Sequence, residues 1–427
     1  MSLATMNALL RRGEAQVSTA APSLRRTAKT VILVNLSGAP SHVDTFDPKP
    51  GPWMPADANL QQNAGGIVLS RTLFPEFSDL AGDLCVMRSV QSWELAHDRG
   101  QFYLITAHQS NPAFIGETPN MGSVVAFEKG TPGPLPAFLS LNGSVLQGST
   151  FLSGLTEPTN APANAGGLTT IQHNYFGAAS QQRFEQKFAL LSDLDGPARN
   201  ANLDKSLADH ASFYTASKKL MYDPVVTAVF QFTADDSTRY GATSFGNACI
   251  VARNATRAQS GTSFITVNLG GWDTHQNMFD RKYNGNMYQQ CNTLDRGVGQ
   301  MVRDLKSSGH LDSTLIVIMG EFGRTPGPLN TQGGRDHHKA AMSAVMLGGG
   351  VKGGRIIGAT DALGANIIDP GWSAQRPIYM EDIACTIYSA LGIDYTKGLL
   401  DTPSGRKFEY VGKAATGAFT SVNEVFG

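Results

Sequence analysis

Acidic side chains and histidines gather in a few short segments of this 427-residue sequence, each next to an apolar run. The segments are 41–47 (SHVDTFD), 93–99 (WELAHDR), 271–277 (GWDTHQN), 320–326 (GEFGRTP) and 334–339 (GRDHHK). Carboxylate oxygens and imidazole nitrogens together suit zinc, manganese or iron. Two such cations a few ångströms apart clamp a phosphoryl or sulfuryl group and lower the pKa of a bound water. The residue types therefore predict a metal-dependent site for anionic esters.

Spacing and charge suggest separate roles for these residues. Asp273 and His275 are two positions apart, so in an extended segment their side chains project to the same side. Arginine donates to anionic oxygens in pairs of hydrogen bonds, which suits substrate binding. The cations predicted to hold the oxygens of a substrate are Arg99, Arg324, Arg335 and Lys339.

An ordinary structural role remains open for each of these residues. An isolated Asp-x-His is usually a loop with local hydrogen bonds, and Asp44 fits the cap of a turn. Ser41 fits a helix N-cap or a turn as well as a nucleophile, and Arg324 fits a structural ion pair. The His337-His338 pair fits one exposed and one hydrogen-bonded histidine. Their common placement after glycine-flanked strand ends favours a functional cluster.

Short apolar runs that end at glycine or a turn predict the strands that position these residues. They are residues 30–36, 83–88, 137–141, 263–269, 313–319 and 343–348. Apolar residues at steps of three and four predict a helix over 285–307, with further helices near 99–107 and 382–391. Continuous apolar strands separated by helices indicate a three-layer α/β sandwich with a mostly parallel central sheet. Ligands of such sheets bind beyond the carboxyl ends of the strands.

Composition limits the classes of function. The chain has 427 residues, 41% of them hydrophobic, which is enough for one large domain or two smaller ones. It has 34 Lys+Arg against 35 Asp+Glu. This balance argues against a broad basic surface for nucleic acid. The four cysteines are widely separated, which predicts buried free thiols rather than disulfides or a thiolate zinc site. The sequence has no apolar run of about 18 residues, so no transmembrane helix is predicted.

Two parts of the chain differ from the predicted sheet domain, which covers residues 29–427. Residues 1–28 are interpreted as a disordered arm or a degraded export signal, because they are polar and the apolar run that follows is too short. Residues 142–262 are rich in Ser, Ala, Asn, Gln and Thr and are predicted to be a helical insertion beside the sheet. Its helical stretches are expected near 180–194 and 204–220.

Several stretches resemble one bacterial family, the domain-of-unknown-function family 1501. They are 38–50 (GAPSHVDTFDPKP), 271–275 (GWDTH), 320–326 (GEFGRTP), 334–338 (GRDHH), 348–361 (GGGVKGGRIIGATD) and 381–394 (EDIACTIYSALGID), within a resemblance that runs from about 29 to 412. That family is similar to the alkaline-phosphatase/sulfatase superfamily. The resemblance implies a central parallel sheet, two divalent metals and hydrolysis of phosphate or sulfate esters through a covalent intermediate.

The resemblance also implies a set of metal ligands: Asp44, Asp273, His275, Glu321 and either His337 or His338. Asp44 stands where the superfamily has its first-strand aspartate, and Glu321 replaces the aspartate after a later strand. The superfamily nucleophile falls near Ser92 and His97, so His97 or Ser41 is predicted near the reacting group. No cysteine is present there, so formylglycine chemistry is not supported. The superfamily usually has Asp-x-x-x-His where this chain has a shorter spacing.

The leading hypothesis is a sulfatase- or phosphatase-like, metal-dependent hydrolase of phosphate or sulfate esters. Its cofactor would be one or two divalent ions (zinc, manganese, calcium or magnesium), without a nucleotide cofactor. Its partner would be a small anionic ester or a sulfated or phosphorylated glycan, without nucleic acid. The family resemblance favours an extracytoplasmic location, and the oligomeric state stays open.

Two other classes of function compete with this one. A non-catalytic binding or assembly protein on the same scaffold is favoured by the missing standard nucleophile and by the low-charge insertion. A cofactor-independent esterase built on Ser41 is weaker, because no Gly-x-Ser-x-Gly elbow surrounds that residue.

Overall fold

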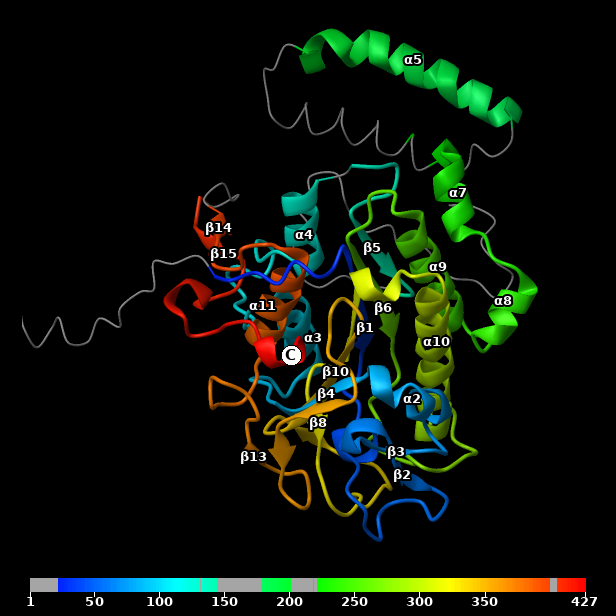
Figure 1. Ribbon diagram of the computed structural model, residues 1–427. Coiled ribbons are helices and arrows are strands. Elements are labelled where there is room, and N and C mark those ends of the chain that lie inside the picture. Colours follow the sequence, from blue (N-terminus) through cyan, green and yellow to red (C-terminus); the bar gives the residue numbers. More distant parts are fainter. Residues whose placement is uncertain (1–21, 131, 144–177, 201–217, 219–220, 400–404) are drawn as a thin grey trace, which may run out of the picture.

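A mostly parallel sheet forms the centre of the protein. The computed structural model describes residues 22–130, 132–143, 178–200, 218, 221–399 and 405–427. One 7-stranded sheet has the order β11-β4-β10-β7-β1-β6-β5 (Figure 1). Its strands are β1 (Thr30–Leu36), β4 (Cys85–Val90), β5 (Phe138–Leu141), β6 (Phe264–Leu269), β7 (Thr314–Met319), β10 (Met342–Leu347) and β11 (Arg355–Ile357). Strand β10 runs antiparallel to β4 and β7, whereas β7, β1, β6 and β5 pair in parallel, as do β4 and β11.

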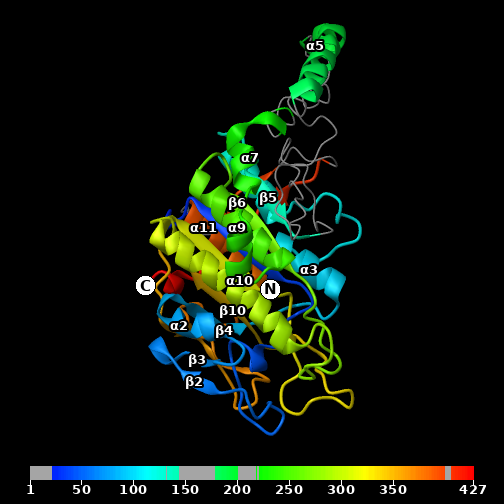
Figure 2. The ribbon, with the colours of Figure 1, turned by 90° about the vertical axis from the view of Figure 1, so that its right-hand side faces the viewer.

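Helices cover both faces of this sheet because alternate side chains of its strands enter two different cores. In β1, Ile32 and Val34 pack into one core, whereas Val31 and Leu33 pack into the other. The first core is shared with α2 (Pro75–Asp79), α9 (Ser244–Ala258) and α10 (Met287–Ser307), and the second with α3 (His97–Thr106), α4 (Met121–Lys129) and α11 (Met380–Leu391). Figures 1 and 2 show the two groups on opposite sides. The predicted three-layer sandwich is confirmed.

The predicted elements of the sandwich are confirmed to within two residues at each end. The largest strand shift is at β4, where a 3-10 turn over Ala81–Asp83 precedes the strand. Helix α3 begins at His97, two residues earlier than expected, so this histidine lies on the first turn of the helix rather than in the loop before it.

The predicted insertion contains α5 (Ala178–Asn200), α7 (Pro224–Phe230), α8 (Ala234–Arg239) and α9. Figure 2 shows α5 standing away from the layers. In contrast, α9 packs against α10 and β6 and belongs to the layer that covers the sheet. The helix expected near 204–220 lies almost entirely outside the described residues, as does most of the predicted N-terminal arm.

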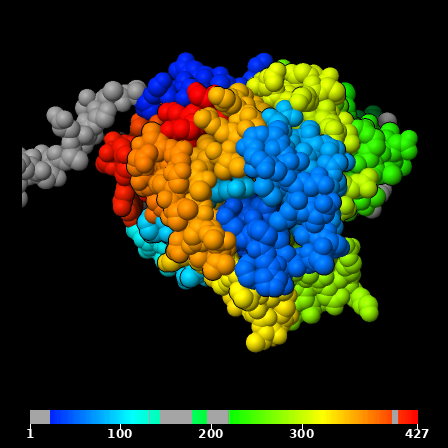
Figure 3. All heavy atoms as spheres, turned by 60° about the horizontal axis from the view of Figure 1, so that its bottom comes forward, coloured from blue at the N-terminus to red at the C-terminus, as the bar shows by residue number. Residues whose placement is uncertain are grey.

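Short two-stranded sheets accompany the central sheet: β2 (Leu60–Gln62) with β3 (Val68–Ser70), β8 (Gly323–Arg324) with β9 (His337–His338), β12 (Ala359–Thr360) with β13 (Ile367–Asp369), and β14 (Gly398–Leu399) with β15 (Phe408–Glu409). In Figure 3 the blue surface around β2 and β3 adjoins the orange surface of the β11–β13 region. Gly65 permits this contact, because a Cβ there would lie 1.9 Å from the Gly354 carbonyl oxygen. The N-terminal part of the chain thus covers the β11 edge of the sheet.

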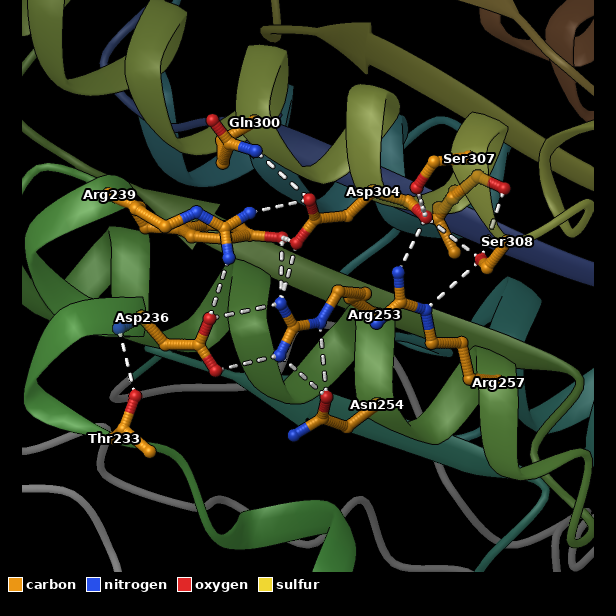
Figure 4. A network of polar contacts seen from close by, with 12 residues as sticks. Thr233, Asp236, Arg239, Arg253, Asn254, Arg257, Gln300, Asp304, Ser307 and Ser308 are labelled. Carbon is orange, nitrogen blue, oxygen red and sulfur yellow. Dashed lines mark hydrogen bonds and ion pairs between the residues drawn. The ribbon is translucent and has the colours of Figure 1, made fainter.

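An ion-pair network joins α8, α9 and α10 on the outer side of one layer (Figure 4). Arg253 of α9 donates to Asp304 of α10 at 2.6 Å and pairs with Asp236 of α8 at 3.3 Å. Asp304 also accepts hydrogen bonds from Arg239 and from the hydroxyl of Tyr240. The network adds to other polar contacts between these helices, such as those of Ser237 with Asn247 and of Arg257 with the Asp304 carbonyl.

Two further predictions concern the thiols and the membrane. Cys85, Cys249, Cys291 and Cys385 are free and buried, which confirms the prediction for the cysteines. Burial raises the pKa of Cys85 to about 12, so this thiol is not poised for thiolate chemistry. Within the described ranges, none of the helices combines the length and the apolar character that a membrane span requires.

Candidate metal centre

Three histidines and one aspartate converge beyond the carboxyl ends of the sheet strands. Asp273 Oδ1 lies 3.2 Å from His97 Nε2, 3.0 Å from His275 Nε2 and 3.7 Å from His337 Nε2. The two nitrogens His275 Nε2 and His337 Nε2 are 3.0 Å apart. A tetrahedral zinc ion with bonds of about 2.1 Å separates its ligand atoms by about 3.4 Å. The cluster, hereafter the His₃Asp cluster, has the dimensions of a metal site.

Parallel neighbouring strands bring these side chains together. Strands β6 and β7 both flank β1, so the loops that follow them leave the sheet at the same edge. Asp273 and His275 lie in the loop after β6, whereas β8 and β9 form the hairpin that follows β7. His97 enters from the first turn of α3, which follows β4. The four residues of the cluster are therefore fixed by three separate elements, namely the loop after β6, strand β9 and helix α3.

The turn after β1 leaves room for the loop that carries Asp273. Gly38 has a φ of +106°, a left-handed conformation that disfavours side chains. A Cβ on Gly38 would lie only 2.6 Å from the backbone nitrogen of Asp273. Glycine is thus required for the close approach of the β1 and β6 loops, which places Asp273 in the His₃Asp cluster.

The Nδ1 atom of each histidine is engaged by an acceptor outside the cluster. His97 Nδ1 lies 2.7 Å from Glu321 Oε1, His275 Nδ1 lies 2.8 Å from Asp336 Oδ1, and His337 Nδ1 lies 2.5 Å from the Leu95 carbonyl oxygen. Carboxylates and carbonyls only accept hydrogen bonds, so Nδ1 carries the hydrogen in all three rings. In the neutral imidazoles, the Nε2 lone pairs then point into the cluster.

Burial and neighbouring charges shift the pKa values of the residues in this cluster. Burial works to raise the pKa of Asp273, but the hydrogen bond and charge of Arg324 hold that pKa below its ordinary value, so the carboxylate is ionised. Burial lowers the pKa of His337 and favours its neutral form. His97 Nε2 is buried without a hydrogen-bond partner. Its hydrogen bond to Glu321 raises the pKa of His97, so a proton on this ring competes with a metal ion for the same place.

Glu321, a predicted ligand, lies behind His97 rather than in the cluster. Its fully buried carboxylate accepts hydrogen bonds from the backbone N–H groups of Gly38 at 3.0 Å and Ala39 at 3.1 Å. It also accepts one from Gln101 Nε2 at 2.6 Å, in addition to the contact with His97. Each carboxylate oxygen thus has two partners. A buried carboxylate behind a histidine orients the ring and increases its basicity toward a metal.

Asp44, also a predicted ligand, lies outside the cluster in a buried ion pair. Arg335 holds it with Nε 2.6 Å from Oδ2 and Nη2 3.2 Å from Oδ1, and both residues have no exposed surface. The Ser41 hydroxyl donates to Asp44 Oδ2 at 2.5 Å. Ser41 and Arg335, predicted as nucleophile and substrate ligand, are therefore both engaged inside the protein with Asp44.

Adjacent histidines in β9 point in opposite directions because side chains alternate along a strand. His337 joins the cluster, whereas His338 Nε2 lies 2.8 Å from the Ala365 carbonyl oxygen and its ring stacks on His42 with centroids 6.0 Å apart. The backbone pairing of β8 and β9 sets Arg324 opposite His337. The sequence left the choice between the two histidines open, and the strand geometry separates them.

Three predicted cations remain, and they differ in exposure. Lys339 is exposed. The Arg99 side chain is 58% exposed and its Nε donates to Glu94 at 2.7 Å. It lies on the first turn of α3, on the surface. Arg324 is fully buried and contacts the cluster directly, with Nη2 2.6 Å from Asp273 Oδ1.

Asp336 is a site residue that the sequence analysis did not single out. It lies beside His337, within the acidic and histidine-rich run 334–339, and this position in the sequence was the signal that could have identified it.

We expect Asp336→Asn to weaken zinc binding by about 10- to 100-fold, the usual loss when an outer partner of a metal-bound histidine is removed. Competition with a chromogenic zinc chelator measures this. Asp280→Asn, an exposed carboxylate outside the cluster, is the control. Equal zinc affinity in both variants would contradict a role for Asp336.

Fold and site together define a class: a three-layer α/β protein with a His₃Asp cluster at the carboxyl ends of its parallel strands. The chain belongs to the family described as "Protein of unknown function (DUF1501)", which matches residues 28–417 and confirms the family resemblance. No curated protein matches the sequence.

Three solved structures are similar to this chain at low sequence identity. Ps i-CgsB is 14% identical with a TM-score of 0.42, over 86% of this chain and 72% of its own. A protein of the alkaline phosphatase superfamily from Vibrio parahaemolyticus is 11% identical with a TM-score of 0.41, over 92% and 76%. PsFucS1 sulfatase from Pseudoalteromonas sp. is 13% identical with a TM-score of 0.40, over 86% and 68%. Likenesses of this size identify no activity or substrate for this chain.

Proposed function

We infer that this protein is a metal-dependent hydrolase of phosphate or sulfate esters, with its divalent ion held by His97, Asp273, His275 and His337. One observation supports this inference above all. Three imidazoles, each fixed with its Nδ1 hydrogen on an outer acceptor, aim their Nε2 atoms at one carboxylate oxygen within a single small cluster. Arg324 faces the Asp273 oxygen and His275 Nε2 from one side, whereas His97 Nε2 is buried without a hydrogen-bond partner, and a divalent ion would supply the attraction that these acceptors lack.

The ligand chemistry favours zinc or manganese over calcium and magnesium. Calcium and magnesium prefer oxygen ligands, whereas imidazole nitrogens suit zinc and neighbouring transition metals. An ion held there supplies a Lewis acid for an ester oxygen and lowers the pKa of a water. The cluster is open to substrate, because the side chains of Asp273 and His275 are 48% and 37% exposed.

The residues around the cluster favour attack by water over a covalent intermediate. The Ser41 hydroxyl is buried and donates to Asp44, and the Ser92 hydroxyl accepts from the Glu94 backbone N–H at 3.2 Å. Neither hydroxyl makes a hydrogen bond to a histidine of the cluster. His97 therefore acts as a ligand in this proposal, with Glu321 holding its ring. A small anionic ester or an anionic glycan is the proposed substrate class.

The convergence of the His₃Asp cluster also motivates a second candidate function, a metal-containing binding protein without turnover.

The test is reconstitution of chelator-treated protein with Zn²⁺ or Mn²⁺, followed by elemental analysis and assays with an aryl phosphate, an aryl sulfate and a sulfated glycan. We expect bound metal and metal-dependent turnover of at least one ester. Bound metal without any turnover would favour the binding protein. Absence of bound metal would contradict both functions.

A further inference from the structure

Arg324 occupies the inner side of the His₃Asp cluster with every donor already in use. Its Nε donates to the Ala39 carbonyl at 3.0 Å, and its Nη2 donates to the Gly38 carbonyl and to Asp273 Oδ1. Its Nη1 donates to the Arg335 carbonyl at 3.1 Å and lies 3.2 Å from His275 Nε2. Arginine has five N–H groups, and all five are accounted for here. The buried guanidinium is thus a permanent positive charge against two of the metal ligands.

The other buried carboxylates near the strand ends are already bound by donors of the protein. Asp44 is paired with Arg335, and Asp47 is paired with Lys49 at 3.1 Å and with Arg88 at 3.2 Å. Glu321 accepts from two backbone amides, Gln101 and His97. Within the described part of the chain, the His₃Asp cluster is the one group of three or more His, Cys, Asp or Glu side chains with ligand atoms close enough to share an ion. A second ion has no ligand set there.

The balance of charges in and around the cluster also indicates a single divalent ion. The cluster and its outer partners hold three carboxylates, those of Asp273, Glu321 and Asp336, against the single guanidinium of Arg324. With neutral imidazoles this leaves two negative charges, which one divalent ion neutralises. A second divalent ion would leave two uncompensated positive charges beside a buried arginine, at a high cost in free energy.

We propose that this centre takes one divalent ion, and that Arg324 is the second cation, which positions Asp273 and binds the anionic substrate. This inference rests on the proposed function and deepens it. An ion bound by His275 Nε2 would take up its lone pair, and the Arg324 Nη1 hydrogen, which lies 3.2 Å from this nitrogen, would then be without that acceptor. That N–H group faces the cluster and is the donor for a phosphoryl or sulfuryl oxygen. Arginine suits this task because its hydrogen bonds to such oxygens are charge-assisted.

The stoichiometry of bound metal tests the inference on the full chain. Chelator-treated protein is loaded with Zn²⁺ alone, dialysed and analysed by elemental analysis and native mass spectrometry. We expect one zinc ion per chain. Two ions per chain would overturn this inference and leave the proposed function intact. No bound ion would overturn the proposed function itself, so the two failures are distinguishable.

The role of the guanidinium is tested with Arg324→Gln, which keeps amide donors for the backbone carbonyls but removes the charge. We expect this variant to bind one zinc ion and to bind inorganic phosphate at least tenfold more weakly than the zinc-loaded wild type, measured by calorimetry. Arg239→Gln, in the exposed part of the ion-pair network of α8, α9 and α10, is the control and keeps the wild-type affinity. Unchanged phosphate affinity in folded Arg324→Gln would overturn the role of Arg324. If that variant does not fold, the stoichiometry of the wild-type protein still decides the number of ions.

Discussion

His337→Ala is expected to bind zinc more than about 100-fold more weakly than the wild type, and to lose metal-dependent turnover with it. Loss of an outer partner of a metal ligand already costs about 10- to 100-fold, so loss of the ligand itself costs more. His337 Nε2 lies 3.0 Å from His275 Nε2 and 3.7 Å from Asp273 Oδ1, within the group of converging acceptors. Zinc affinity by chelator competition and turnover of an aryl ester measure the two losses.

The neighbouring histidine provides a matched control. His338 differs from His337 by one position in β9, but its Nε2 contacts the Ala365 carbonyl oxygen and its ring stacks on His42. His338→Ala is therefore expected to lower the free energy of unfolding by about 1 kcal/mol, the usual value of one hydrogen bond, and to keep zinc affinity. Equal loss of zinc binding in both variants would show that β9 presents its histidines differently. Unchanged zinc binding in both would remove His337 from the metal site.

Arg253→Met is expected to lower the free energy of unfolding by about 3–5 kcal/mol, the range found when one partner of a buried ion pair is removed. The Arg253 side chain is 6% exposed and Asp304 is 12% exposed, so Asp304 is left buried with less compensation. The hydrogen bond from Arg253 is among those that hold the pKa of Asp304 below its ordinary value against the effect of burial. Urea denaturation of both proteins at pH 7 measures the difference.

An exposed member of the same network separates burial from charge. Arg239 pairs with the same two carboxylates, Asp236 at 2.9 Å and Asp304 at 2.6 Å, but its side chain is 45% exposed (Figure 4). Arg239→Met is expected to cost at most about 1 kcal/mol, because exposed ion pairs contribute little. Similar losses for both variants would contradict the assignment of the stability to the buried pair. Zinc binding by the His₃Asp cluster is expected to stay unchanged in both variants, since the network lies on α8, α9 and α10.

The membership of the His₃Asp cluster shows where sequence reasoning stops. Asp273-x-His275 was predictable, because a spacing of two and a position after a strand are local properties of the sequence. Glu321 was equally well placed in the sequence, after β7, yet it accepts hydrogen bonds from the amides of Gly38 and Ala39. No spacing in the sequence indicates that the turn after β1 presents its N–H groups at that point. The family resemblance placed Glu321 near the site. In the structure it contacts the Nδ1 atom of His97 rather than joining the cluster itself.

Asp44 illustrates the same limit for charged pairs. Its position after the first strand suited a ligand, whereas the structure pairs it with Arg335, 291 positions further along the chain. Both side chains are buried, so each needs the other, because an unpaired charge in the interior costs folding free energy. The sequence shows the chemical type of each residue, but the fold decides which opposite charge lies beside it.

The sequence by itself determined the α/β sandwich and the strands that are followed by acidic residues and histidines. Apolar periodicity and glycine at strand ends are local signals, which is why these features were predictable. Only the tertiary structure decided which of those residues share one cluster. It selected His337 over His338, brought in His97 from α3 and placed Arg324 against Asp273. The physical reason is that the geometry of the cluster depends on the relative placement of loops from different strands, which long-range packing sets.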